Sequence, residues 1–288
     1  MPDSDAASSF TDARGTRIFY DVYPAEGAAR AVVQILHGVG EHAGRYRVLA
    51  ETLAAHGYIV YADDHLGHGR TGIVQHGHPG KLGRLGPGGM RAARDAVYAL
   101  TERIRREHPD LPLILLGHSW GSFLAQMLVD RHAASFDALV LSGSALRTPG
   151  SLNAGDLNAP WKGDDAMGTE WLSSDHAVGR AFLDDPLTTS EPLLKLFGPL
   201  EAARLFGRPA RNLPRDLPTL LMVGREDTVG GPRSVHRLAE AYRTRSGFTD
   251  VTTLVYPGAR HEIFNEVMQE EVRADLVAWL DPRFPARD

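Results

Sequence analysis

The stretch LILLGHSWGSFLA, residues 113–125, decides how the rest of the sequence is interpreted. The apolar run LILL leads into a serine, Ser119, that is flanked by Gly117 and Gly121 and followed by a segment with apolar residues at helical spacing. A sharp turn from strand to helix needs small flanking residues, because the backbones approach closely and the central residue takes strained dihedral angles. Such a turn exposes the hydroxyl at a helix N-terminus, where free N–H groups favour negative charge. The stretch therefore predicts a reactive serine rather than a simple glycine-rich turn.

Composition limits the classes of protein to consider. The 288 residues are 43% hydrophobic and 23% charged, close to globular averages, so the chain can bury a sizeable core. A net charge of -5 and scattered Lys and Arg residues argue against a nucleic-acid partner. The sequence contains no cysteine, which excludes disulfides, thiolate metal sites and a cysteine nucleophile. Because MPDSDAASSF has no signal-peptide pattern and no apolar run reaches ~18 residues, we expect a cytoplasmic protein.

Short apolar runs recur along the chain and alternate with helical patterns. Runs this continuous predict strands that are covered on both faces, and parallel neighbours need crossover helices between them. Apolar residues at helical spacing predict helices over 46–54 and 90–104. The expected fold class is α/β, with a mostly parallel, doubly wound sheet. The predicted strands are residues 31–36, 58–62, 113–117, 138–143, 219–224 and 252–257.

The alternation stops at the end of the fourth predicted strand. Residues 145–212 hold no comparable run and many Pro, Gly and Asp residues, with helix-like pieces at 169–183 and 191–206. Compact domains rarely carry irregular loops of this length. We therefore predict a helical cap at 145–212, inserted between two parts of one core, residues 1–144 and 213–288.

A serine hydroxyl is a poor nucleophile at neutral pH and needs a base that is itself oriented by an acid. After a G-x-S-x-G elbow, these partners are expected in the order acid and then histidine, each following a later strand. Asp227 follows the run 219–224, and His261 follows the run 252–257. We predict that Ser119 attacks, that His261 takes its proton, and that Asp227 holds the imidazole. Glu226 remains an alternative acid.

Acyl transfer also needs N–H donors for the oxyanion of the tetrahedral intermediate. The backbone N–H of Trp120, directly after the nucleophile, is one predicted donor. The other is expected in the loop HGVGEH, most plausibly at Val39. His37 is then interpreted as a structural or cavity-lining residue rather than a second base.

Together these residues resemble the bacterial lysophospholipase and monoacylglycerol lipase branch of the α/β-hydrolases. The resemblance covers most of the chain and implies the α/β-hydrolase fold, the triad and oxyanion donors already named, and a cap over an acyl-chain tunnel. It implies no cofactor and no metal. The segments that carry it are HGVGEHAGRY (37–46), YADDHLGHGRT (61–71), GHSWGSFLA (117–125), WLSSDHAVGRAFLDDPL (171–187), GREDTVGG (224–231) and YPGARHEIFNE (256–266).

The resemblance also indicates substrate contacts. It points to Glu41 and Arg45 as contacts for a glycerol-like head group, and we expect His118 to contact the substrate as well. The alternative for Glu41 and Arg45 is an ion pair between residues four apart on the first helix.

Some features depart from the family. Methionine is common at the position of Trp120, so a bulky indole there could shorten or redirect the acyl pocket. The glycine-rich stretch 80–89 is unlike the lipases, and the cap matches least well. The expected reaction is hydrolysis of a carboxylic ester of a single-chain lipid, a lysophospholipid or a monoacylglycerol, through an acyl-serine. A small non-lipid ester, lactone, amide or peptide substrate stays open.

Two other classes of protein compete with this interpretation. The motif DDHLGH, with Asp63, Asp64, His65 and His68, could hold a metal ion in a metal hydrolase. Alternatively, the fold could bind a ligand without turning it over.

The apolar residues of the predicted cap can be interpreted in two ways. They either form the core of the cap or make a surface that contacts a membrane or a second copy of the chain, and the sequence does not give the oligomeric state. These residues are Trp161, Trp171, Phe182, Leu193, Leu194, Leu196 and Phe197.

Overall fold

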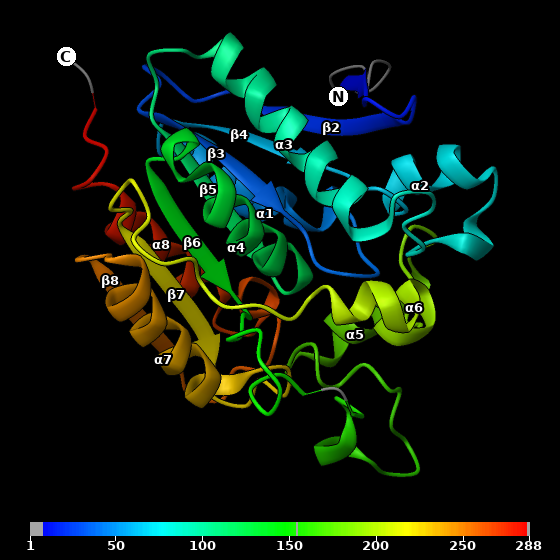
Figure 1. Cartoon of the computed structure of the whole chain (residues 1–288). Coiled ribbons are helices and arrows are strands. Elements are labelled where there is room, and N and C mark those ends of the chain that lie inside the picture. Colours follow the sequence, from blue (N-terminus) through cyan, green and yellow to red (C-terminus); the bar gives the residue numbers. More distant parts are fainter. Residues whose placement is uncertain (1–7, 154, 287–288) are drawn as a thin grey trace.

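The computed structural model describes residues 8–153 and 155–286, which form one sheet between two layers of helices (Figure 1). The strand order is β1-β2-β4-β3-β5-β6-β7-β8, with β3 to β8 parallel and with β1 and β2 antiparallel at one edge. The strands are β1 (Ser8–Thr11), β2 (Arg17–Tyr23), β3 (Ala31–Leu36), β4 (Tyr58–Asp63), β5 (Leu113–His118), β6 (Ala138–Ser142), β7 (Thr219–Gly224) and β8 (Val251–Tyr256).

All six predicted strands are present, and their bounds agree with the apolar runs to within one residue. Every residue of β3, β5, β6 and β7 is buried, as expected for strands covered on both faces. The prediction is wrong for β8, whose residues 252–255 are only half-buried because β8 forms an edge of the sheet. Strands β1 and β2 were not predicted: β1 has only four residues, and in β2 the buried residues alternate with partly exposed ones over part of its length.

Two sets of helices cover the faces of the sheet (Figure 1). Apolar residues of α3, α4 and α7 pack in one cluster with Leu113, Leu115 and Leu221. Those of α1 and α8 pack on the other face with Ile114 and Leu116. Neighbouring residues of β5 thus point to opposite layers, as the pleat of a strand requires. The helices are α1 (Arg47–Ala55), α2 (Gly69–His76), α3 (Gly89–Glu107), α4 (Trp120–His132), α5 (His176–Asp184), α6 (Leu193–Ala203), α7 (Gly231–Ala241) and α8 (Gln269–Leu280).

Short turns complete the described elements. They are the 3-10 turns η1 (Ala43–Tyr46), η2 (Pro79–Lys81), η3 (Ala133–Ser135), η4 (Ala159–Trp161) and η6 (Ile263–Asn265), and the π-helical turn η5 (Tyr242–Ser246).

The long connection from β6 to β7 carries η4, α5 and α6. Figure 1 places α5 and α6 together beyond the tips of the central strands, on the side toward which their arrows point. Helix α6 is interrupted at Gly198, whose φ of 73° no ordinary helix contains, and Pro199 follows. We propose that residues 145–212 act as the cap expected from the sequence, and we use that name below.

Among the helices within residues 8–153 and 155–286, none is long and apolar enough to cross a membrane.

Candidate active site

Ser119 lies in the turn between β5 and α4, with φ 52° and ψ -124°. A positive φ of this kind is unfavourable for a residue with a side chain and persists only where the surroundings enforce it. The Ser119 N–H donates to the carbonyl of Ser142 at 2.9 Å, and the Ser119 carbonyl accepts from the N–H of Ser122, also at 2.9 Å. The turn therefore has the strained strand-to-helix geometry that the sequence predicted, with Ser119 directly before the helix.

The two flanking glycines are required by space. A Cβ on Gly117 would lie 2.6 Å from the carbonyl oxygen of Gly121. A Cβ on Gly121 would lie 2.2 Å from the carbonyl oxygen of Leu36, which is in the neighbouring strand β3. Any side chain at either position would push the elbow away from the sheet.

His261 and Asp227 meet at the carboxyl ends of β7 and β8. The distance from His261 Nδ1 to Asp227 Oδ2 is 3.1 Å, and both side chains are buried. The rival acid, Glu226, is about half-exposed and lies 3.9 Å from Arg260 instead. The geometry thus favours Asp227 over Glu226 as the partner of the imidazole.

The other nitrogen of His261, Nε2, is buried and has no hydrogen-bond partner among the described residues. Burial disfavours the charged ring, yet the adjacent Asp227 carboxylate, followed by Glu262 and Glu41, raises the pKa of His261 above its ordinary value. A base with a free Nε2 and a carboxylate on Nδ1 is equipped to accept a proton and to stabilise the imidazolium.

Val39 and Trp120 both line the cavity beside Ser119. The Gly38 carbonyl accepts a hydrogen bond from His37 Nδ1 at 2.7 Å. Because the C=O and N–H groups of a trans peptide point in opposite directions, the N–H of Val39 is turned away from His37. No residue in the described part of the chain accepts a hydrogen bond from it. The Trp120 N–H opens helix α4, where the first N–H groups have no partner within the helix.

The indole of Trp120 is turned away from the nucleophile. It is 1% exposed, stacks on the ring of His68 at 5.0 Å and packs against Phe197 of α6 at 5.2 Å. Its Nε1 donates to the sulfur of Met90 at 3.4 Å. The side chain therefore fills the space between the core and the cap as well as lining the cavity.

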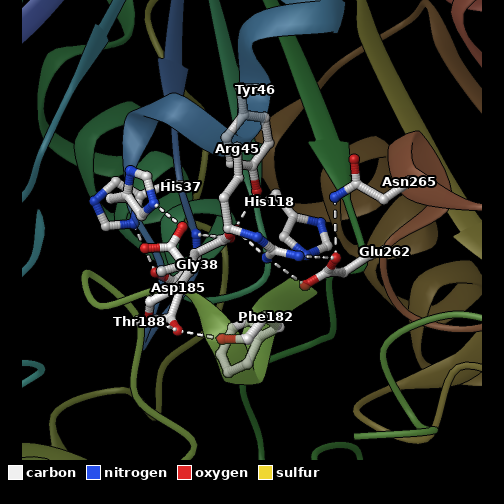
Figure 2. A network of polar contacts seen from close by, with 12 residues as sticks. His37, Gly38, Arg45, Tyr46, His118, Phe182, Asp185, Thr188, Glu262 and Asn265 are labelled. Carbon is white, nitrogen blue, oxygen red and sulfur yellow. Dashed lines mark hydrogen bonds and ion pairs between the residues drawn. The ribbon is translucent and has the colours of Figure 1, made fainter. Parts of the chain in front are cut away.

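Figure 2 shows the polar network around Arg45. Its guanidinium contacts Glu41 and Glu262, with N–O distances of 2.7 Å to each. The ion pair between residues four apart is thus present, but it does not lie on the first helix, because Glu41 precedes η1 and α1 begins only at Arg47. It is extended by Glu262, 217 positions after Arg45. Glu41 lines the cavity, whereas Arg45 is behind it and is not among the cavity-lining residues.

His118 also lines the cavity, with its ring 4.8 Å from that of His261. Its Nδ1 is 3.2 Å from the hydroxyl of Ser142. Burial, and then the neighbouring His261, hold the pKa of His118 well below its usual value. A neutral imidazole in this position can exchange hydrogen bonds with a substrate without adding charge.

The cavity itself has a volume of about 520 Å³. The core contributes the polar residues already described, and the cap contributes mostly apolar ones. Apolar cap residues that line it include Leu157, Trp171, Phe182, Leu193, Leu194, Leu205 and Phe206. A volume of this order suits a small molecule or one acyl chain.

Each ionisable residue of DDHLGH has a polar partner within the protein, although Asp63 Oδ1, His65 Nε2 and His68 Nε2 are buried without a hydrogen bond to any described residue. Asp64 accepts from the N–H of Ala43 at 2.9 Å and binds Arg70, and His65 Nδ1 is 2.8 Å from Asp63. The His37 Nε2 accepts from the N–H of His65 at 3.0 Å, so both nitrogens of His37 are engaged. Across the described ranges, no three His, Cys, Asp or Glu side chains gather as a metal site would require. The motif organises the turn behind the oxyanion loop.

The sequence analysis missed Glu262. Its carboxylate binds Arg45 through both oxygens and accepts from Asn265 at 3.0 Å. The one signal in the sequence was an acidic residue directly after the predicted histidine, which by itself is common on surfaces.

Comparisons with known proteins agree with this fold. Residues 27–268 match the Hydrolase_4 family, described as serine aminopeptidase, S33. The chain is 33% identical to a monoacylglycerol lipase of Mycolicibacterium smegmatis, over 94% of this chain and 95% of that protein. It is 28% identical to a monoglyceride lipase of Mus musculus, over 96% of this chain and 90% of that protein.

A solved structure supports the fold. A thermostable carboxyl esterase from Bacillus coagulans, in complex with glycerol, superimposes with a TM-score of 0.83 at 24% identity, covering 97% of this chain and 98% of that one. At this identity the likeness concerns the architecture. Together with the sequence matches, it shows that the chain belongs to the Hydrolase_4 family of α/β-hydrolases, in its monoacylglycerol lipase-like branch.

Proposed function

We propose that the protein is a serine esterase that hydrolyses monoacylglycerols. The observation that carries this is the meeting of Ser119, the paired His261 and Asp227, and two free backbone N–H groups at one apolar cavity. The relatives from Mycolicibacterium smegmatis and Mus musculus, named as monoacylglycerol and monoglyceride lipases, support it over almost the whole chain.

In the proposed mechanism, His261 Nε2 takes the proton of Ser119 as its oxygen attacks the ester carbonyl. The N–H groups of Val39 and Trp120 receive the oxyanion, and Asp227 stabilises the imidazolium. His261 then passes the proton to the departing alcohol, leaving an acyl-Ser119. A water molecule, deprotonated by the same imidazole, resolves the ester and releases the fatty acid.

The charges around the cavity favour a neutral head group. The part of the cavity lining that the structure describes includes no lysine or arginine that could receive a phosphate. Its carboxylates are all paired, which leaves none free for a substrate ammonium group. The pairs are Glu41 and Glu262 with Arg45, Asp156 with Lys162, and Glu191 with Lys195.

This charge pattern separates the substrates that the sequence left open. A lysophospholipid would place its phosphate without a cation, and burying an unpaired charge is costly. A peptide N-terminus would likewise find no free carboxylate, which disfavours the aminopeptidase chemistry in the description of the family. The hydroxyls of a glycerol group need only hydrogen bonds, which Glu41 and His118 can provide at the cavity surface.

The cap carries the apolar surface through which such a substrate would arrive. Leu194 is 60% exposed and also lines the cavity, and Leu200 is 78% exposed on the same helix. Leu183 of α5 and Phe206, just after α6, are also exposed. We propose that this face of the cap contacts the lipid surface. The cytoplasmic location expected from the sequence stays a prediction.

The test combines labelling with turnover. Intact-mass spectrometry after incubation with a fluorophosphonate is expected to show one adduct on the wild type and none on Ser119→Ala. Hydrolysis of 1-monooleoylglycerol is then compared with that of oleoyl lysophosphatidylcholine and of p-nitrophenyl esters of increasing chain length. The proposal expects monooleoylglycerol to be preferred.

Absence of an adduct on the wild type would overturn the serine mechanism. An adduct together with a preference for the lysophospholipid, or for acetate over long-chain esters, would keep the mechanism and overturn the substrate.

A further inference from the structure

Two loops far apart in the sequence meet at the Ser119 hydroxyl. The oxyanion loop, residues 37–46, carries Val39, and the histidine loop, residues 258–266, carries His261. The guanidinium of Arg45 joins them, as Figure 2 shows. The reaction needs the oxyanion donor and the base to keep one spacing, so the way these loops are joined bears directly on rate.

On the histidine-loop side, the contact is a bidentate ion pair. Arg45 Nη1 donates to Glu262 Oε1 and Nη2 donates to Oε2, both at 2.7 Å. Glu262 directly follows His261 in the chain, and its own N–H donates to the carbonyl of Leu172 in the cap at 2.7 Å. Parallel hydrogen bonds of this kind fix direction as well as distance. The position of Arg45 therefore constrains the backbone next to His261.

On the oxyanion-loop side, Glu41 continues the chain of contacts. Its Oε2 accepts from Arg45 at 2.7 Å, and its Oε1 accepts from the N–H of Gly38 at 2.5 Å. The hydroxyl of Tyr46 donates to the same Oε1 at 2.7 Å. His37 in turn holds the carbonyl of Gly38, so Gly38 is fixed through both its N–H and its C=O, and this carbonyl belongs to the peptide group that carries the Val39 N–H.

Burying the charges of Glu41, Arg45 and Glu262 costs free energy. The side chains of Glu41, Arg45 and Glu262 are only 3%, 11% and 5% exposed. Removing a charge from water costs several kcal/mol, and well-packed apolar residues often stabilise a fold as well as a buried ion pair does. Stability alone therefore gives no reason for three buried charges beside the active site.

We propose that the Arg45–Glu262 ion pair is a brace that keeps His261 at a fixed distance from the Val39 oxyanion donor. Arg45 and Glu262 are positioning residues, which act through the two loops and do not touch the reacting atoms. This inference rests on the proposed function, because that distance matters only if Ser119, His261 and Val39 act on one substrate carbonyl.

The same residues also set the charge near the base. The ionisable groups facing His261 are Asp227 after β7, His118 at the end of β5, Glu41 and Arg45 in the oxyanion loop, and Glu262 beside it. Burial alone would raise the pKa of Glu262, but the Arg45 guanidinium outweighs it and lowers this pKa to about 2. Glu262 is therefore a carboxylate throughout the working range. Burial raises the pKa of Glu41, and once Glu41 is also ionised the trio with Arg45 carries one net negative charge.

Three variants separate a brace from a pure charge effect. Glu262→Gln brings the net charge of the trio to zero, Arg45→Met brings it to -2, and the double variant restores -1. The brace predicts that kcat falls about 10-fold to 100-fold in all three, since a misplaced catalytic group costs up to about 100-fold. KM is expected to change little.

The pH profile of kcat/KM gives the second readout. Removing a negative charge makes the His261 imidazolium less stable. The acid limb of the profile, where the rate falls as the base is protonated, should therefore move to lower pH in Glu262→Gln. It should move to higher pH in Arg45→Met and return close to the wild-type position in the double variant. Recovery of the acid limb without recovery of kcat is the signature of a brace.

Two further variants guard against misfolding. Arg105→Met removes another arginine whose side chain is ion-paired, to Asp137 at 2.7 Å, but at the opposite end of the sheet, so its activity should equal that of the wild type. Glu262→Asp keeps the charge and shortens the side chain, and the brace predicts a lower kcat with the acid limb unmoved.

The inference is overturned if kcat in the three variants stays within about twofold of the wild type, or if the double variant recovers it. It is also overturned if Glu262→Asp, the mildest change, has the kcat of the wild type. A fluorophosphonate adduct on the wild type keeps such a failure distinct from failure of the proposed function.

Discussion

The two sides of the cavity are built differently. On the sheet side, Ser119, His261 and Val39 follow buried central strands and a strand at the sheet edge, and their neighbours are fixed by backbone hydrogen bonds. On the cap side, the lining comes from loops, from α5 and from α6, and α6 is kinked at Gly198 and exposes Leu200. The difference teaches that the proposed catalytic residues are held by the sheet, whereas the apolar lining comes from a part of the chain with fewer constraints.

The largest expected effect tests whether the sheet side holds the triad. Asp227→Asn keeps the size of the side chain but removes the charge that holds the imidazole, so kcat should fall by about 10⁴-fold. Glu226→Gln, one residue earlier and about half-exposed, should stay within about twofold of the wild type. Steady-state kinetics on p-nitrophenyl butyrate measure both. The reverse order would assign the acid to Glu226, and equal losses would contradict the assignment to Asp227 alone.

The next-largest effect, on stability, compares a glycine on the sheet side of the cavity with a glycine in the cap. Gly121→Ala places a Cβ 2.2 Å from the Leu36 carbonyl oxygen and should lower the free energy of unfolding by at least about 3 kcal/mol. Gly198→Ala meets no atom within 4 Å, so only its φ of 73° opposes the change, at about 1 to 2 kcal/mol. Urea denaturation of both variants gives the comparison. A larger loss at Gly198 would mean that the cap is as tightly built as the sheet.

The pH dependence sharpens the electrostatic side of the comparison. Because Asp227, Glu262 and Glu41 outweigh burial and raise the pKa of His261, the acid limb of kcat/KM should have its midpoint above the ordinary 6.5. Below that midpoint the base is protonated, and the rate should fall about tenfold per pH unit. Stopped-flow or plate assays from pH 5 to 9 measure it. A midpoint below 6.5 would contradict the proposed surroundings of the base.

The smallest effect on the fold concerns the cap surface. Leu200→Ser should change the free energy of unfolding by less than about 0.5 kcal/mol, since the residue is exposed, yet weaken binding to phosphatidylcholine vesicles. Val267→Ser is the matched control, because Val267 is 72% exposed but belongs to the segment before α8. Vesicle sedimentation reports binding. Equal binding by both variants would remove the cap surface from the proposal.

The sheet could be predicted from the sequence better than the cap. The central strands were predicted to within one residue, because strands buried on both faces read as continuous apolar runs. The fold and the family are confirmed by the comparisons. Strand β2 was missed because many of its residues are partly exposed and its partner β4 lies 37 to 43 positions later, at Val60 to Asp63.

In the cap, helices were expected over 169–183 and 191–206, but α5 begins only at His176 and α6 ends at Ala203. Residues 170–174 are instead held by the histidine loop: the N–H of His261 donates to the Trp171 carbonyl at 3.3 Å, and Glu266 binds Ser174. Such contacts between distant segments override local helix preference.

The residues of the candidate site also differ in whether the sequence could predict them. The nucleophile, the acid and the histidine could be proposed from their order along the chain, because each follows a recognisable strand. The Arg45–Glu262 pair joins residues 217 positions apart and has no local pattern, so only the folded chain reveals it.

The backbone of Ser119 has one further consequence. A residue held at φ 52° is strained unless it is glycine, and relief of such strain is worth about 1 to 2 kcal/mol. By this measure alone a glycine suits the turn better than the serine, but it would remove the proposed nucleophile. The residue that fits this backbone best is therefore not the one that the proposed reaction needs.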